Sequence, residues 1–365
     1  MSFAENYSFL DRILHHLAFS VPGVQKLMAD IETDINKKQL NSIQSSNEIF
    51  VTGLPRSGTT LLLDFLHQTD EFCTYSYRHM PFILAPLLWK KLSKPFAKQG
   101  ESVERAHGDG MEVSFDSPEA FEEVIWLSYL KEQYVLADRL EPLTLKNTSQ
   151  SFAEKMVNTI KKLLLESIDS SSDSTAIQKR YISKNNANCS RIPVLTKLFP
   201  SATILVPFRE PLAHIGSLMK QHQQFTEMHK DDDFAKSYMR WLGHYDFGEN
   251  FKPINFNNWI ENYPGTIDYN DENFWLQYWI AGYSDMLSMK SQQVHLVDYN
   301  KLLLQPELVL GKIAKVTDVS DKANFVKNAE SVRAPTSRAK DSSQINPEIL
   351  ESANRLFHQL QKAAL

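Results

Sequence analysis

The chain has 365 residues, of which 42% are hydrophobic and 23% are charged, an ordinary composition for a globular protein. Its 39 lysines and arginines against 44 aspartates and glutamates give a formal net charge of −5, which excludes a general electrostatic attraction to nucleic acid. The two cysteines, Cys73 and Cys189, show neither metal-ligand nor CxxC spacing, which excludes a disulfide framework and fits a reducing, cytoplasmic compartment.

The N-terminal segment predicts helices. Residues 6–19 place apolar side chains on one helical face, and a second helix is expected from beyond Gly23 to about Gln39. Acids and histidines stand where a signal peptide needs a basic start and an unbroken apolar core, and no run has the length of a transmembrane helix. We therefore expect no membrane span and a helical extension over 1–47, which docks either on the main domain or on a second subunit of a homodimer.

Residues 48–68, EIFVTGLPRSGTTLLLDFLHQ, predict a strand, a glycine-bearing loop and a helix in succession. The apolar run 49–51 indicates a buried strand, and helical spacing of apolar residues begins at Thr59. In such a unit backbone N–H groups point into the loop, and the helix N-terminus adds a partial positive charge. The stretch therefore predicts a cradle for a phosphate-like group.

The loop GLPRSGTT differs from the phosphate loop of nucleoside triphosphatases, GxxxxGK[ST]. Gly53, Gly58 and Thr60 fit that frame, but Thr59 takes the place of the lysine that reaches the β- and γ-phosphates. A different cation, Arg56, lies inside the loop. An ordinary strand-to-helix turn is the plain alternative. Two glycines, an arginine and three hydroxyls at one helix start favour an anion site instead.

Four more strands are expected in chain order, with helices between most of them, at 72–76, 180–183, 202–208 and 294–297. The aromatic-rich stretch 225–270 has no regular spacing and is expected to be irregular. Strands alternating with helices predict an α/β fold of three layers, with a central parallel sheet of about five strands and one domain over 48–365. Ligands of such sheets lie beyond the carboxyl ends of the strands, so the loops after 49–51 and 202–208 should share one edge.

A second anion-binding pattern follows the strand at 202–208. Arg209 ends that strand, and Ser217 lies eight residues later in the next helix. A guanidinium binds phosphate through two parallel hydrogen bonds, and a serine adds a neutral donor. Taken alone, a carboxylate partner would explain the arginine and a helix surface position the serine. The upstream loop favours a second phosphate site.

With both patterns in place, the chain resembles sulfotransferases that use 3′-phosphoadenosine 5′-phosphosulfate, and among them soluble members of the bacterial type, over about residues 48–340. The resemblance implies a P-loop-like fold and transfer of a sulfonyl group to a hydroxyl or amine of a small molecule, a glycan or a lipid. It also implies the product adenosine 3′,5′-bisphosphate and no need for a metal. The residues that it places on the donor are Pro55, Arg56, Ser57, Gly58, Thr59, Thr60, Arg209 and Ser217.

The resemblance calls for a base that deprotonates the acceptor, commonly a glutamate just after the loop helix, and this chain has no glutamate between Phe72 and Leu88. His79 can take a proton near neutral pH and is predicted as the catalytic base, with Arg56 as the catalytic cation. A structural histidine is the plain alternative. The rival bases lie downstream, at His107, Asp109, Glu119 and Glu123.

Two further basic elements take a role only from the resemblance. Lys184, after the strand at 180–183, is either directed at the donor or solvated. The loop 332–340 either covers the donor or is a surface loop, and it lacks the glycine-rich pattern of cytosolic members.

Two other functions stay open. A P-loop nucleotide kinase is disfavoured by Thr59 in the lysine position and by the lack of a clear strand aspartate for magnesium. A catalytically inactive nucleotide-binding module is compatible with the missing glutamate.

Overall fold

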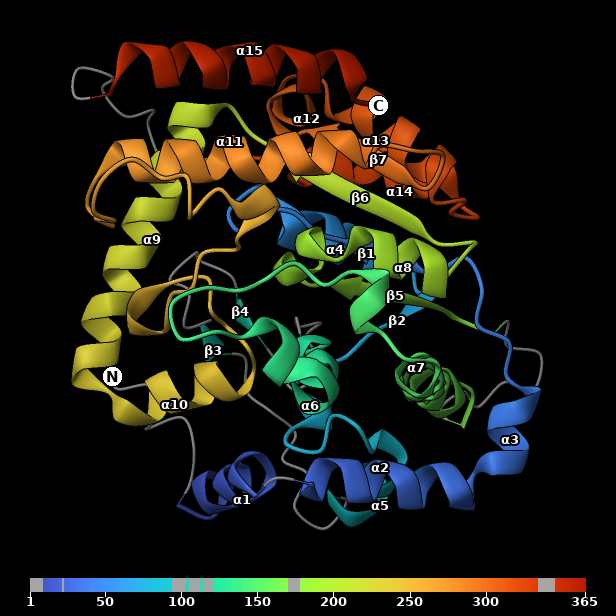
Figure 1. The fold of residues 1–365 in the computed structure, drawn as a ribbon. Helices are drawn as coiled ribbons and strands as arrows, with labels where there is room; N and C mark the ends of the chain where they lie inside the picture. Colours follow the sequence, from blue (N-terminus) through green and yellow to red (C-terminus); the bar gives the residue numbers. More distant parts are fainter. Residues whose placement is uncertain are drawn as a thin grey trace.

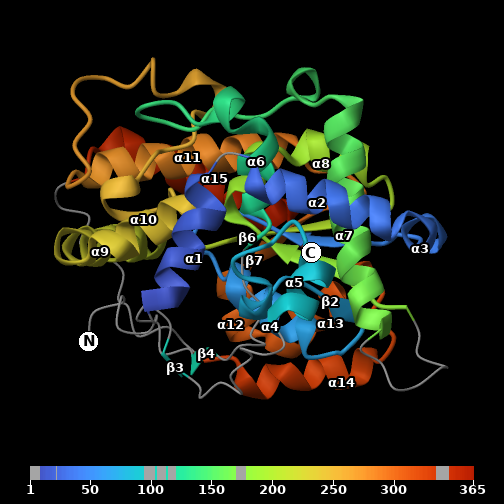
Figure 2. The same ribbon diagram turned by 90° about the horizontal axis from the view of Figure 1, so that it is seen from below.

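A computed structural model describes residues 9–21, 23–93, 103–104, 112–113, 121–169, 178–333 and 345–365 (Figures 1 and 2). Its strands are β1 (Ile49–Val51), β2 (Phe72–Cys73), β3 (Val103–Glu104), β4 (Glu112–Val113), β5 (Arg180–Lys184), β6 (Thr203–Phe208) and β7 (Val294–Asp298). Its α-helices are α1 (Phe9–Ser20), α2 (Val24–Ile35), α3 (Lys37–Ser42), α4 (Thr59–His67), α5 (Pro86–Ser93), α6 (Glu123–Tyr134), α7 (Gln150–Asp169), α8 (Ile192–Leu198), α9 (Pro211–Asp231), α10 (Asp233–Trp241), α11 (Glu272–Ser288), α12 (Tyr299–Leu304), α13 (Pro306–Val316), α14 (Lys322–Val326) and α15 (Pro347–Ala363).

Five strands form one parallel sheet in the order β2-β5-β1-β6-β7, which confirms the predicted sheet. β1 is central, and its Val51 pairs with Lys184 of β5 and Leu205 of β6. The carboxyl ends of these three strands therefore lie side by side. The loops that follow them, including the predicted anion loops, share one edge of the sheet.

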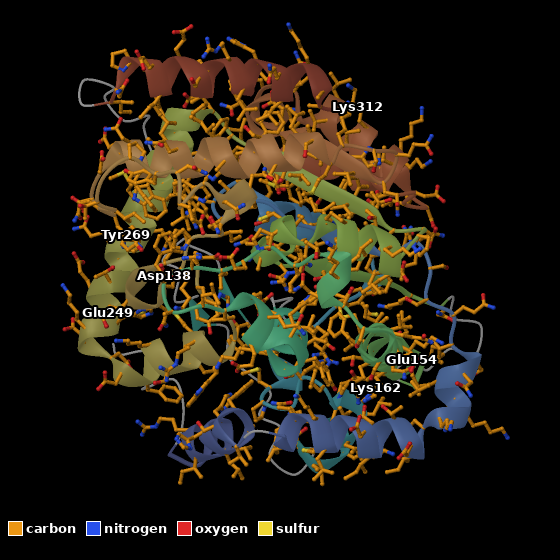
Figure 3. All side chains as sticks on the ribbon, in the orientation of Figure 1. Asp138, Glu154, Lys162, Glu249, Tyr269 and Lys312 are labelled. Carbon is orange, nitrogen blue, oxygen red and sulfur yellow. The ribbon has the colours of Figure 1, made fainter. Side chains whose placement is uncertain are left out.

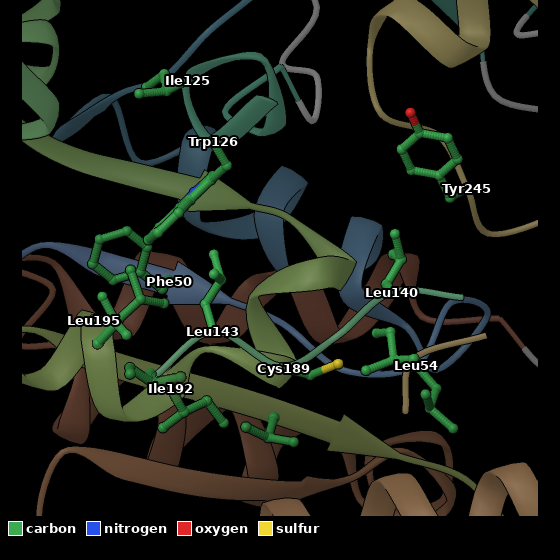
Figure 4. Close-up of a cluster of buried hydrophobic side chains, with 14 of the residues drawn as sticks. Phe50, Leu54, Ile125, Trp126, Leu140, Leu143, Cys189, Ile192, Leu195 and Tyr245 are labelled. Atoms are coloured by element: carbon green, nitrogen blue, oxygen red, sulfur yellow. The ribbon is translucent and has the colours of Figure 1, made fainter. Parts of the chain in front are cut away.

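Helices cover both faces of the sheet, as the α/β prediction requires. Because side chains alternate along a strand, Ile49 and Val51 pack with α4, α12, α13 and α14 on one face. Phe50 points to the other face, into a larger core that α6, α7, α8, α9, α11 and α15 share. Figure 4 shows part of this core, where Phe50 lies near Trp126 and Leu195.

The N-terminal helices pack on the same chain, at the end of the molecule that carries α5 and α7 (Figure 1). The buried ammonium of Lys162 in α7 donates to the backbone carbonyls of Ala29 and Leu84, at 2.8 and 3.1 Å (Figure 3). Burial lowers the pKa of this ammonium to about 8. The boundary predicted at residue 47 stays a prediction. No helix in the described ranges is long and apolar enough to span a membrane.

α1 docks through a different face from the one predicted. His15 and Phe19 contact the rings of Tyr238 and Trp241 in α10. Ile13 and Leu17, expected on the docking face, are each 49% exposed, so that prediction was wrong. The aromatic contacts with α10 fix the rotation of the helix, and aliphatic spacing alone does not show them.

Two other predictions of local structure need correction. The stretch 225–270 begins with helix, because α9 continues to Asp231 and α10 covers Asp233–Trp241. Its aromatic rings pack in the core, and their abundance concealed the helical spacing. The second strand is shorter than expected, at Phe72–Cys73, because the chain turns away from β5 after pairing with it at two residues.

Candidate functional site

The loop between β1 and α4 has the backbone of an anion cradle. Arg56, with φ of 67°, and Gly58, with φ of 103°, have left-handed backbone. Gly58 is the N-cap of α4, and no side chain caps this helix. Within the described part of the chain, the backbone N–H groups of Ser57, Thr59 and Thr60 donate to no other residue. Such N–H groups at a helix start bind phosphate and sulfate.

Tyr299, directly after β7, packs against this loop. A Cβ at Gly58 would lie 2.6 Å from the Tyr299 ring, so only glycine fits there. The same ring lies 5.1 Å from the guanidinium carbon of Arg209, in a cation–π contact. Tyr299 therefore joins the loop after β1 to the arginine after β6.

The two predicted arginines meet at the carboxyl edge of the sheet. Arg209 donates from Nη1 to the backbone carbonyl of Arg56 at 3.0 Å. Arg56 donates from Nε to the Ser217 hydroxyl at 3.3 Å. The structure thus brings together Arg56, Arg209 and Ser217, three side chains that the sequence patterns predict as anion ligands.

Arg209 is buried without a negative partner. Among the described residues it forms no ion pair, and its contacts are the Arg56 carbonyl and the Tyr299 ring. Burial lowers the pKa of its guanidinium and the nearby charge of Arg56 lowers it too, while Tyr299 and Glu210 oppose this only in part. An anion bound at this point would relieve both effects, because it supplies the missing counter-charge.

A buried histidine holds the loop in place. His214 of α9 donates from Nε2 to the backbone carbonyl of Pro55 at 2.8 Å and accepts at Nδ1 from the Trp279 indole at 3.2 Å. An indole N–H can only donate, so the His214 ring is neutral. Burial and the charge of Arg209 lower the pKa of His214 to about 3.

A polar chain leaves the other side of the loop, toward the segment between α10 and α11. The Thr59 hydroxyl donates to Oδ1 of Asn186 at 3.2 Å, and Nδ2 of Asn186 donates to Oδ2 of Asp246 at 2.9 Å. Lys184, at the end of β5, is buried rather than solvated. Burial raises the pKa of the Asp246 carboxyl, and the hydrogen bond from Asn186 and the charge of Lys184 oppose this only in part.

Comparison with known families identifies the fold. The model of the sulfotransferase family matches residues 48–258, more than half of the chain, and includes both anion-binding patterns. The chain belongs to the sulfotransferase family. No curated protein matches the chain.

Three solved sulfotransferase structures resemble this sulfotransferase. STF1 from Mycobacterium tuberculosis H37Rv is 12% identical, with 96% of this chain and 86% of that chain covered and a TM-score of 0.49. STF9 from Mycobacterium avium is 13% identical, with 91% and 81% covered and a TM-score of 0.49. The sulfotransferase domain from the curacin biosynthetic pathway is 12% identical, with 87% and 99% covered and a TM-score of 0.39.

His79 lies at another part of this sulfotransferase. It lies six residues after β2, a strand that β5 separates from β1 and that therefore runs about 10 Å across the sheet from β1. Its Nδ1 accepts from the backbone N–H of Ser76 at 2.9 Å, and its Nε2 is 2.9 Å from Oε2 of Glu166. His79 and Glu166 line a cavity of about 910 Å³ along β2 that contains none of the predicted donor residues.

Of the rival bases, Glu123 is held by hydrogen bonds within the fold. It accepts from both terminal nitrogens of Arg191, at 2.9 and 3.1 Å, and from Tyr134 and Asn185. The other three rivals, His107, Asp109 and Glu119, lie outside the described residues, as does most of the loop 332–340.

Three residues around the sulfotransferase loop were not predicted from the sequence. His214 lies between Arg209 and Ser217, and its helical position between the two predicted phosphate ligands was a usable signal. Tyr299 directly follows a strand of the sheet, so the strand-end rule could have found it. Asp246 had no such signal, because only tertiary packing brings it to the loop.

Proposed function

We propose that this sulfotransferase takes its sulfonyl group from 3′-phosphoadenosine 5′-phosphosulfate and transfers it to a hydroxyl or amine of a small molecule, a glycan or a lipid. One observation carries the proposal. Two arginines from loops after neighbouring strands meet beside unpaired helix-start N–H groups, and Arg209 is buried and forms no ion pair among the described residues. A nucleotide with phosphate groups on both sides of its ribose supplies the two anions that this site lacks.

Each of the two anionic groups of the nucleotide would bind at one of the two sequence patterns. Arg56 and the N–H groups of residues 57–60 would hold the 5′-phosphosulfate, with Pro55 kept in place by His214. Arg209 and Ser217 would hold the 3′-phosphate. Ser217 accepts from Arg56, so its own hydroxyl hydrogen remains as a donor for a phosphate oxygen.

The same residues would stabilise the charge that develops during transfer. When the sulfonyl group leaves, negative charge grows on the 5′-phosphate oxygen, and Arg56, the loop N–H groups and the N-terminus of α4 would lie beside that oxygen and stabilise the charge. Lys184 adds a cation from β5. Thr59 replaces the lysine that nucleoside triphosphatases use, which suits a sulfonyl group with less charge than a γ-phosphate.

His79 is one of two candidates for the base of this sulfotransferase, and it is the one predicted from the sequence. In the neutral ring Nδ1 accepts from the Ser76 N–H, so the Nε2 hydrogen faces Glu166. His79 would have to release the Ser76 N–H before it could accept a proton.

Incubation of the purified protein with sulfur-labelled donor and extracts of the native host tests the proposal. We expect labelled acceptor together with adenosine 3′,5′-bisphosphate, and the same yield in the presence of a chelator. Calorimetric titration should show binding of the bisphosphate and none of ATP with magnesium. Transfer that stops with the chelator, or ATP binding in place of the bisphosphate, would contradict the proposal and favour a kinase.

A further inference from the structure

We propose that Asp246 is the general base of this sulfotransferase, the carboxylate that takes the proton from the acceptor hydroxyl. The inference rests on the proposed function and assigns a residue that no sequence motif marks. Its basis is the position of Asp246, one amide group away from the start of α4.

The contacts of Asp246 place it beside the donor loop. Asn186 bridges the two, because its Nδ2 donates to Oδ2 of Asp246 at 2.9 Å while its Oδ1 accepts from the hydroxyl of Thr59 at 3.2 Å. The preceding residue, Tyr245, belongs to the same buried cluster as Leu54 of the loop (Figure 4). Asp246 is thus fixed relative to the N-terminus of α4, where the sulfonyl group would lie.

The second carboxylate oxygen is available for a substrate. Oδ1 of Asp246 has no hydrogen-bond partner in the described ranges, and the side chain is half-buried rather than sealed in the core. One oxygen is therefore held by Asn186 and the other can accept. A base needs this combination of a fixed position and one open lone pair.

The charges around Asp246 suit proton transfer. Lys184 of β5 and Glu123 of α6 act on its titration, and the buried Cys189 and Tyr278 lie near it and are neutral. Burial raises the pKa of the carboxyl above its ordinary value, against the hydrogen bond from Asn186 and the charge of Lys184. A carboxylate with a raised pKa is a stronger base.

The lone pair of the neutral His79 imidazole already accepts a hydrogen bond. A neutral imidazole has one lone pair, and that of His79 accepts from the backbone N–H of Ser76 at 2.9 Å. Its Nε2 hydrogen faces the Glu166 carboxylate. His79 would have to give up the hydrogen bond from Ser76 before it could take a proton, whereas Oδ1 of Asp246 can take one directly.

The step balances with Asp246 in this role. The acceptor O–H bond breaks and its proton goes to Oδ1 of Asp246, while the acceptor oxygen forms a bond to sulfur. The bond between sulfur and the 5′-phosphate oxygen breaks, and its electron pair stays on that phosphate oxygen, next to Arg56. The Asp246 carboxylic acid then releases its proton to solvent.

Asp246→Asn is the informative variant, because the amide oxygen still accepts from Asn186. Asp285→Asn is a matched control: Asp285 also accepts from an asparagine, Asn257, at 3.0 Å, and burial also raises its pKa. His79→Gln tests the other candidate for the base, His79. The probe is sulfur-labelled 3′-phosphoadenosine 5′-phosphosulfate at saturation, with transfer measured to water as sulfate and to acceptors in a host extract. Bisphosphate affinity is measured on the same samples.

We expect Asp246→Asn to lower turnover by about 10²–10⁴-fold and to remove the acidic limb of its pH profile. Bisphosphate affinity should stay within about threefold, and Asp285→Asn should keep wild-type turnover. Near-normal turnover of Asp246→Asn would overturn the inference, as would an equal loss in Asp285→Asn, which would show a general packing effect. Wild-type protein that binds no bisphosphate or transfers to neither water nor extract would instead contradict the proposed function.

Discussion

Two buried arginines of this chain, Arg191 and Arg209, are in opposite electrostatic states. Arg191 is fully buried, donates twice to Glu123 and lies against the rings of Trp126 and Tyr134. Its pKa is raised: burial lowers it, but the charge and hydrogen bonds of Glu123, together with Tyr134 and Glu122, outweigh that effect. Arg209 forms no ion pair among the described residues, and burial and the charge of Arg56 lower its pKa against the opposing effect of Tyr299 and Glu210.

The difference separates a structural cation from a binding cation. An arginine that stabilises the fold carries its counter-charge within the chain, and removal of either partner leaves an uncompensated buried charge. An arginine that binds an anionic ligand stays short of negative charge until the ligand arrives. The first should govern stability and the second affinity, and the predictions below test this division.

Arg191→Met should have the largest effect. It leaves the Glu123 carboxylate buried without its cation, and loss of one partner of such a pair typically costs about 3–5 kcal/mol. Urea denaturation should show this drop in the free energy of unfolding. A loss below about 1 kcal/mol would mean that Arg191 is not the structural cation described here.

Arg56→Ala should act on binding instead. We expect calorimetric titration to show adenosine 3′,5′-bisphosphate bound more weakly by about 2–4 kcal/mol, as a charge-assisted contact to a buried anion is lost. The free energy of unfolding should change by less than about 0.5 kcal/mol, since partly exposed side chains outside such networks contribute little. A large loss of stability with normal binding would reverse the comparison.

Gly58→Ala should affect both properties. An L-residue in left-handed backbone costs roughly 1–2 kcal/mol, and the added Cβ would meet the Tyr299 ring at 2.6 Å. Unfolding free energy and bisphosphate affinity should both fall. Adding Tyr299→Leu should recover part of the loss, because it relieves the contact but not the backbone strain. No recovery would show that the ring contact carries none of the effect.

The smallest effect concerns pH. The pKa of His214 is lowered to about 3, below its value of about 6.5 in an unfolded chain, so the unfolded state binds more protons between these limits. Stability from the neutral ring is therefore full above pH 6.5 and is lost as the pH falls. Between pH 7.5 and 5.5 wild type should lose about 1 kcal/mol more than His214→Gln in urea unfolding. Equal slopes would contradict a neutral, buried His214.

Local patterns predicted the sheet and the meeting of Arg56, Arg209 and Ser217 at one of its edges, because each pattern is a continuous stretch of the sequence. β1, the loop and α4 form one continuous stretch, and Arg209 follows its strand directly, so periodicity and spacing were sufficient. Asp246 and the contacts of His79 depend on which distant segments pack together. Residues 246 and 186 meet across 60 positions, and residues 79 and 166 across 87, and no local pattern encodes such pairs.

The assignment of Arg209 to the 3′-phosphate can be measured most directly with a cycle of two proteins and two ligands. Wild type and Arg209→Ala are titrated with adenosine 3′,5′-bisphosphate and with adenosine 5′-phosphate, which lacks only the 3′-phosphate. If Arg209 binds the 3′-phosphate, loss of that phosphate should weaken binding to wild type by about 2–4 kcal/mol and to Arg209→Ala by much less. Equal weakening in both proteins would remove Arg209 from the 3′-phosphate and contradict the account.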